Sequence, residues 1–137
     1  MQKEVPNVKW HGYIPPGTLR ALYNSRLFHL CPSEYEGFGH YIHEALACGA
    51  IVVTSDLPPM NEFRGCPKDL LVPVRDTYPC QIATMARVTP TDIAAVVDRC
   101  LSLDDDTIEK YRREARAAYE WEVLDFQERL LKVMNSL

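Results

Sequence analysis

Short apolar runs alternate with a segment of helical spacing in the first half of the chain. The runs "LFHLCPS" (27–33) and "AIVVTS" (50–55) lack the alternation of a half-exposed strand, which is typical of strands buried on both faces of a parallel sheet. Between them, "YIHEALACG" (41–49) has helical spacing and ends at Gly49, a residue type that commonly follows a helix. This order predicts a right-handed strand–helix–strand unit and an α/β class with a Rossmann-like parallel sheet.

The flanking segments predict further elements of the same kind. Strands are expected over 8–14 and, more weakly, over 69–74. A short helix capped by Thr18 should follow the first of these strands, and a loop rich in turn residues should follow the second. Three later segments have helical spacing and give the chain a helical C-terminal end: 93–101, 105–119 and 121–136.

Composition narrows the class of protein. The chain has 137 residues, 47% of them apolar and 25% charged, which suits one globular domain over 1–137. A formal net charge of −4 argues against a general nucleic-acid binder. The five cysteines include no C-x-x-C pair and suggest reduced thiols in a cytoplasmic protein. No apolar run approaches the length of a membrane span.

A glycine turn stands between the first buried strand and the helix that follows it. In "SEYEGFGH" (33–40), Gly37 and Gly39 would let the backbone approach a ligand at the carboxyl end of a parallel strand. The free N–H groups of the helix N-terminus would favour an anion, phosphate above all. A tight turn without a ligand is the alternative interpretation. A dinucleotide fingerprint is absent, because Ile42 stands where its third glycine would be.

Two glutamates flank this turn. Glu44 lies about 7 Å along the helix axis, and Glu36 lies in the turn, so their carboxylates are expected roughly 10 Å apart. That exceeds the roughly 5 Å between the two carboxylates of a retaining glycosidase. The separation suits two hydroxyl-bearing ends of an elongated ligand whose phosphates rest on the amides between them.

These residues resemble a known family. The segment 31–63, "CPSEYEGFGHYIHEALACGAIVVTSDLPPMNEF", resembles the donor-binding segment of retaining GT-B glycosyltransferases of family 4, the glycosyl transferases group 1. Glu36 and Glu44 match the spacing of its two glutamates, around Gly-Phe-Gly and before Ala-Cys-Gly. The segments 7–33 and 114–134 are similar to its preceding strand–helix and to its C-terminal helix, and Glu62 falls where the family has another glutamate.

The resemblance implies a nucleotide-sugar donor site in the second half of a two-domain enzyme. Glu36 would contact hydroxyls of the transferred sugar as the catalytic residue, and Glu44 would hold the ribose. The donor-binding set would also include Gly37, Phe38, Gly39 and His40. The family needs no metal or other cofactor and retains the anomeric configuration, and stabilisation of the departing diphosphate should be the main catalytic effect. Such a role belongs to glycan biosynthesis.

The sequence departs from the family pattern after the glycine turn. Family members usually have an apolar pair there, whereas this chain has His40, Tyr41, Ile42 and His43. His40 could face the diphosphate as a cation, opposed by the helix dipole, or could be a solvated polar residue. A metal site built from His40, His43 and Cys48 lacks a fourth ligand at suitable spacing. His29 and Cys31 are most simply core residues.

A second departure concerns what the sequence lacks. The upstream Arg and Lys that neutralise the diphosphate in the family are absent, as is the N-terminal acceptor-binding domain, so a truncated domain is expected. Arg64, Lys68 and Arg75 are downstream cations without an assigned role. The edge of strand 27–32 would pair either with segment 8–14, through a crossover by the helix 18–25, or with a second copy of the chain, and self-association is expected. Peripheral membrane association would concern only the full-length enzyme. An inactive nucleotide-sugar binding or scaffolding module is the alternative function.

Overall fold

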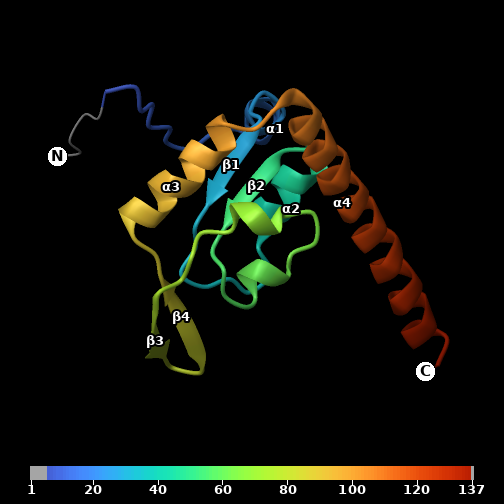
Figure 1. Ribbon diagram of the computed structural model, residues 1–137. Coiled ribbons are helices and arrows are strands. Elements are labelled where there is room, and N and C mark those ends of the chain that lie inside the picture. Colours follow the sequence, from blue (N-terminus) through green and yellow to red (C-terminus); the bar gives the residue numbers. More distant parts are fainter. Residues whose placement is uncertain (1–5, 137) are drawn as a thin grey trace.

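A strand–helix–strand unit forms the centre of the fold in the computed structural model, which describes residues 6–136 (Figure 1). Strand β1 (Phe28–Cys31) leads through helix α2 (His40–Ala47) to strand β2 (Ile51–Thr54). The two strands are parallel, with Phe28 opposite Ile51 and Cys31 opposite Thr54. The predicted α/β class and the parallel, Rossmann-like pairing are confirmed.

Strand β2 is buried along its whole length because both faces of the small sheet are covered. Val52 belongs to a core cluster with Ile42 and Leu46 of α2, and Ala115 of the last helix joins it. Ile51 and Val53 point to the opposite cluster, which includes Val96 of helix α3 (Pro90–Leu101). Cover on both faces explains why the sequence of β2 is a continuous apolar run.

One long helix, α4 (Asp105–Met134), replaces the two helices predicted over 105–119 and 121–136. No glycine or proline lies near residue 120, where the first predicted helix was expected to end, so the helix continues. Its first half packs on α2, where Ala115 joins the core cluster of Ile42 and Leu46. The connection at Gly65 also approaches α4 closely, since a Cβ at Gly65 would lie 3.0 Å from Ala115 Cα. Its second half extends beyond the rest of the fold (Figure 1). That half exposes several apolar side chains, including Leu124, Phe126 and Leu131.

The prediction of a strand over 8–14 is wrong. These residues form no regular element, and Trp10 and Tyr13 are exposed, so no buried sheet position exists for them. Strand β1 therefore has β2 as its one strand neighbour within residues 6–136. Self-association through its other edge stays a prediction.

Two other boundaries shift for local reasons. Helix α1 (Pro16–Asn24) begins before the predicted cap Thr18, because proline at the first helical position is already set for helix geometry. The weak strand predicted over 69–74 reduces to a single parallel bridge between Ser55 and Val72. The short 3₁₀ turns Met60–Glu62 and Lys68–Leu70 occupy the connections on either side of Gly65.

A β-hairpin occupies the segment predicted as a loop. Strands β3 (Asp76–Cys80) and β4 (Ala83–Arg87) pair antiparallel and are joined by Gln81 and Ile82. Gln81 has a φ of +54°, the left-handed conformation that tight hairpin turns require. The sequence has Gln-Ile at this turn in place of the usual Asn-Gly or Asp-Gly signal, so sequence patterns alone do not predict the hairpin.

Candidate functional site

The glycine turn, residues 34–39, lies at the carboxyl end of β1 and leads directly into α2. Gly39 is the N-cap of α2 and has a φ of +70°. A Cβ at this position would lie 2.5 Å from Cζ of Phe63, so any other residue would combine a strained backbone with displacement of the Phe63 ring. Gly37 meets no such restriction, since a Cβ there would point into open space. The structural need for glycine is thus confined to one of the two positions.

The N-terminus of α2 offers amide groups that the helix does not use. The first helical hydrogen bonds run from Ile42 and His43 N–H to the Gly39 carbonyl, at 2.9 and 3.1 Å. No side chain caps this terminus, so the N–H groups that precede Ile42 are left without a helical acceptor. Together with the helix dipole, such groups form a site that favours a negatively charged ligand.

Glu36 lies in a compact group of hydroxyls that we call the hydroxyl cluster: Ser33, Glu36 and Tyr41. Ser33 Oγ donates to Glu36 Oε1 at 2.8 Å, and Tyr41 OH donates to the same oxygen. Ser33 is itself held by Ser55, whose hydroxyl donates to the Ser33 carbonyl at 2.6 Å. Burial and the hydrogen bond to Glu36 raise the pKa of Tyr41 to about 12. The Glu36 carboxylate is therefore fixed by side chains of the turn and of α2.

Glu44 lies in a different environment, on the wall of a cavity of about 740 Å³. Helix α1 and the residues before it form one side of this cavity, and α2 and α4 form the other. Three tyrosines line it together with Glu44: Tyr13, Tyr23 and Tyr119. Arg116 also reaches the cavity, where it pairs with Glu120 at 2.7 Å and donates to the Ala47 carbonyl. Glu36 and the glycine turn do not line this cavity.

Phe38, His40 and His43 gather at the start of α2. The Phe38 ring lies 4.7 Å from the His40 ring and 4.8 Å from the His43 ring, so both histidines share one side of the helix. His43 Nδ1 also lies 3.3 Å from Glu122 Oε2, which joins α2 to α4. Within residues 6–136 no group of three or more His, Cys, Asp or Glu side chains could hold a metal ion.

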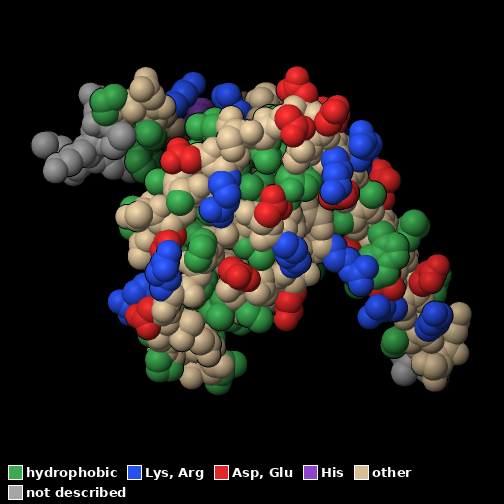
Figure 2. Space-filling model, viewed as in Figure 1, with side chains coloured by type: hydrophobic (Ala, Val, Ile, Leu, Met, Phe, Trp, Pro, Cys, Tyr) green, Lys and Arg blue, Asp and Glu red, His purple; other side chains and the backbone are tan. Residues whose placement is uncertain are grey.

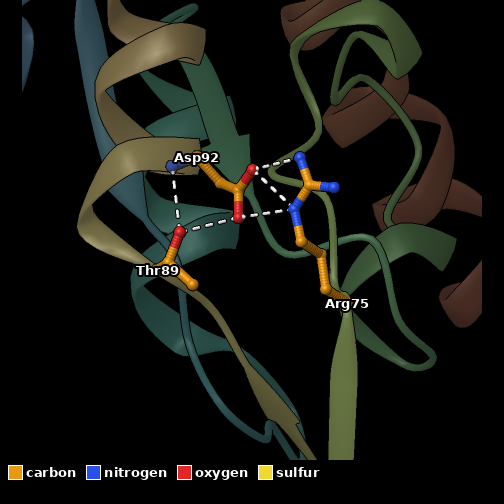
Figure 3. A network of polar contacts seen from close by, with 3 residues as sticks. All are labelled: Arg75, Thr89 and Asp92. Carbon is orange, nitrogen blue, oxygen red and sulfur yellow. Dashed lines mark hydrogen bonds and ion pairs between the residues drawn. The ribbon is translucent and has the colours of Figure 1, made fainter.

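The three downstream cations have structural partners. Arg75 forms an ion pair with Asp92, 2.7 Å from Nη2 to Oδ1, and Thr89 also donates to this carboxylate (Figure 3). Arg75 and Thr89 hold the pKa of Asp92 below its usual value. Arg64 stacks on Trp121, 4.0 Å from the ring centroid, and Lys68 donates to the Asn61 carbonyl. These contacts hold the segments that contain the three cations in place, and none of them involves the glycine turn.

The hairpin contacts the glycine turn, which the sequence did not indicate. Ala86 N–H of β4 donates to the Glu34 carbonyl at 2.7 Å, and Tyr78 OH of β3 donates to the Glu34 carboxylate at 2.8 Å. The hairpin thus supports the residues that precede Glu36. The sequence offers one signal for this hairpin, the strand-like run "TMAR" (84–87), and no recognisable turn precedes that run.

Charge and hydropathy limit the classes of ligand. Acidic and basic side chains are interspersed over the face shown in Figure 2, without a continuous basic surface. Among the described helices, none combines the length and the apolar character needed to cross a membrane. All five cysteines are free, and burial raises the pKa of Cys31 and of Cys66 to about 12, so both are inert thiols.

Comparison with known proteins points to one family. Residues 2–66 match the family model described as glycosyl transferases group 1. Over 58 residues the chain is 40% identical to the O-antigen chain mannosyltransferase B of Escherichia coli, a stretch that covers 42% of this chain and 15% of that protein. The family match includes α1, the glycine turn, α2 and both parallel strands. It does not extend to the hairpin or to α4, where the tail was expected to resemble the family as well.

Proposed function

We propose that this chain, which carries a group 1 glycosyltransferase segment, binds the nucleotide-sugar donor of a sugar-transfer reaction. The observation that carries the proposal is the placement of the two glutamates. Glu44 lines a cavity with three tyrosines, whereas Glu36 stands in the turn before the uncapped end of the same helix. One helix thus separates two polar sites, which suits a ligand with different groups at its two ends.

The cavity beside Glu44 is where we place the nucleoside. Its volume, about 740 Å³, lies in the range of small-molecule sites, and tyrosine rings provide flat surfaces for a base. Glu44 is exposed, and its carboxylate would accept hydrogen bonds from the ribose hydroxyls. Arg116 and the tyrosine hydroxyls would contact the edge of the base.

The diphosphate belongs at the N-terminus of α2 in this proposal. The amides before Ile42 would donate to phosphate oxygens, and their alignment would stabilise the negative charge that develops on the leaving group. The sugar would then lie toward Glu36, with Phe38 and His40 exposed beside it. Glu36 would accept a hydrogen bond from a sugar hydroxyl and so orient the anomeric carbon.

Further features of the reaction are proposed from the family resemblance alone. Transfer would proceed with retention of configuration and without a metal or other cofactor, in the cytoplasm. The acceptor would bind to a second, N-terminal domain, as the family resemblance implies. The 137-residue chain by itself would therefore bind the donor without transferring its sugar.

A catalytically inactive nucleotide-sugar binding module is the second candidate. One observation favours it: Arg64, Lys68 and Arg75 are all engaged elsewhere in the fold, so none of them neutralises a diphosphate at the glycine turn. Both candidates share the donor site and differ only in transfer.

Titration calorimetry tests the shared part of the proposal. GDP, GDP-mannose, UDP, UDP-glucose and NAD are titrated into the chain. We expect one nucleoside diphosphate and its sugar conjugate to bind, the conjugate more tightly, and NAD not to bind. Binding of NAD alone, or of none of the five, would refute the donor site. Adding the N-terminal domain of a complete group 1 enzyme and measuring sugar transfer separates the enzyme from the inactive module.

A further inference from the structure

Among the described residues of α2, only Tyr41 has a side chain that forms a hydrogen bond with the glycine turn, through Glu36. The same hydroxyl also contacts Ser33 Oγ. Its hydroxyl and that of Ser33 both reach Glu36 Oε1. Within residues 6–136 no hydrogen bond engages the second carboxylate oxygen, Oε2. The carboxylate is therefore held at one oxygen and free at the other.

The ring of Tyr41 has a separate role from its hydroxyl. The ring packs against the core cluster that contains Ile42, Leu46 and Val52, and this contact would be the same for phenylalanine. The hydroxyl adds only the contacts with Ser33 and Glu36. Replacing tyrosine by phenylalanine thus isolates the effect on the carboxylate from the effect on the core.

We propose that Tyr41 is a positioning residue that orients the Glu36 carboxylate, so that Oε2 accepts a hydrogen bond from the sugar of the donor. This inference rests on the proposed function, in which Glu36 contacts the sugar. A carboxylate held by two hydroxyls at one oxygen loses little further conformational freedom when the ligand binds. Without the Tyr41 hydroxyl, Glu36 would have to be ordered by the ligand itself, and the sugar would contribute less to the affinity.

The test compares two affinities in two variants. The sugar contribution is the ratio of the dissociation constant of GDP to that of GDP-mannose, or of UDP to that of UDP-glucose if the chain binds uridine nucleotides. In Tyr41→Phe we expect this ratio to decrease about 3- to 10-fold, while the affinity for the free diphosphate stays within about twofold. Tyr111→Phe is the matched control, because Tyr111 OH donates to Asp69 at 2.7 Å, away from the turn. It should leave both affinities unchanged.

A spectroscopic measurement tests the contact itself. Tyrosine-ring NMR of the free chain, with the signal assigned through Tyr41→Phe, should show Tyr41 still protonated at about pH 11, where ordinary tyrosines ionise. Glu36→Gln should lower the pKa of Tyr41 and leave that of Tyr111 unchanged. A merely structural role of the ring would not produce this response.

The outcomes distinguish this inference from the proposed function. If GDP-mannose or UDP-glucose binds more tightly than its diphosphate and Tyr41→Phe keeps the ratio, the positioning role is refuted and the donor site stands. If Tyr41 ionises at the ordinary pKa, the positioning role is refuted whatever the affinities. If the wild-type chain binds no nucleotide at all, the proposed function is refuted and the role of Tyr41 with it. In the double variant with Glu36→Gln, Tyr41→Phe should have no further effect.

Discussion

The two glutamates of the site differ in how the fold treats them. Glu36 is half-buried and held at one oxygen by two hydroxyls, in the same turn as Gly39, whose left-handed backbone and contact with Phe63 favour glycine. Glu44 is exposed on the wall of an open cavity. Two glutamates only eight residues apart can therefore differ in mobility, one carboxylate being rigid and the other adaptable. A rigid group suits a reacting sugar, and an adaptable group suits the ribose that anchors the donor.

The largest expected effect comes from Gly39, the last residue of the turn that contains Glu36. Gly39→Ala places a Cβ at a φ of +70° and against the Phe63 ring, so it should lower the free energy of unfolding by about 2 kcal/mol or more. Chemical denaturation measures this effect. Gly37→Ala is the control and should change the stability by no more than about 0.5 kcal/mol. Equal losses of unfolding free energy in both variants would show that the turn tolerates no side chain at either position, and that the effect is not specific to Gly39.

The next effect concerns the Glu44 side. Glu44→Ala should weaken binding of the free nucleoside diphosphate by about 1.5–3 kcal/mol, or roughly 10- to 100-fold, because it removes hydrogen bonds from a carboxylate to the ribose. Glu114→Ala is the control, since Glu114 lies on the exposed side of α4 with Lys110 as its ion-pair partner, 3.9 Å away. An unchanged calorimetric affinity in Glu44→Ala would contradict the ribose assignment.

Glu36 should show the complementary pattern. Glu36→Gln should lower the affinity for the nucleotide-sugar about tenfold and leave that for the nucleoside diphosphate nearly intact, because only the sugar reaches this carboxylate. Glu34→Gln, two residues earlier in the same turn, is the control for indirect effects on the turn. Equal loss of both affinities in Glu36→Gln would mean that the two glutamates act on the same part of the ligand.

The smallest effect on the site is expected from the ion pair that anchors α3. The pKa of Asp92 is lowered in the folded chain, by Arg75 first and then by Thr89, so its contribution to stability is present at neutral pH. That contribution should be lost as the pH decreases below about 4, where the unfolded chain gains a proton first. Asp92→Asn should reduce this pH dependence in thermal unfolding and leave both nucleotide affinities unchanged. A loss of affinity would show that α3 and the site are coupled.

The core of the fold was predictable because its signals are local. The apolar runs of β1 and β2 and the helical spacing of α2 each follow from burial of consecutive residues. Gly49, with a φ of +65°, follows α2 as expected from the sequence. The strand predicted over 8–14 is wrong because the alternating pattern of this segment is typical of a strand, yet the described fold offers it no strand partner.

The sequence by itself determined the strand–helix–strand unit, the glycine turn and the identity of the two glutamates, because these depend on residue type and spacing along one short segment. Only the tertiary structure decided what surrounds them. The Phe63 ring behind Gly39, the Glu34 contacts of the hairpin, and the α1 and α4 walls of the Glu44 cavity all come from distant parts of the chain. Such contacts depend on how elements pack, and packing is set by the shapes of both partners rather than by a pattern in either one.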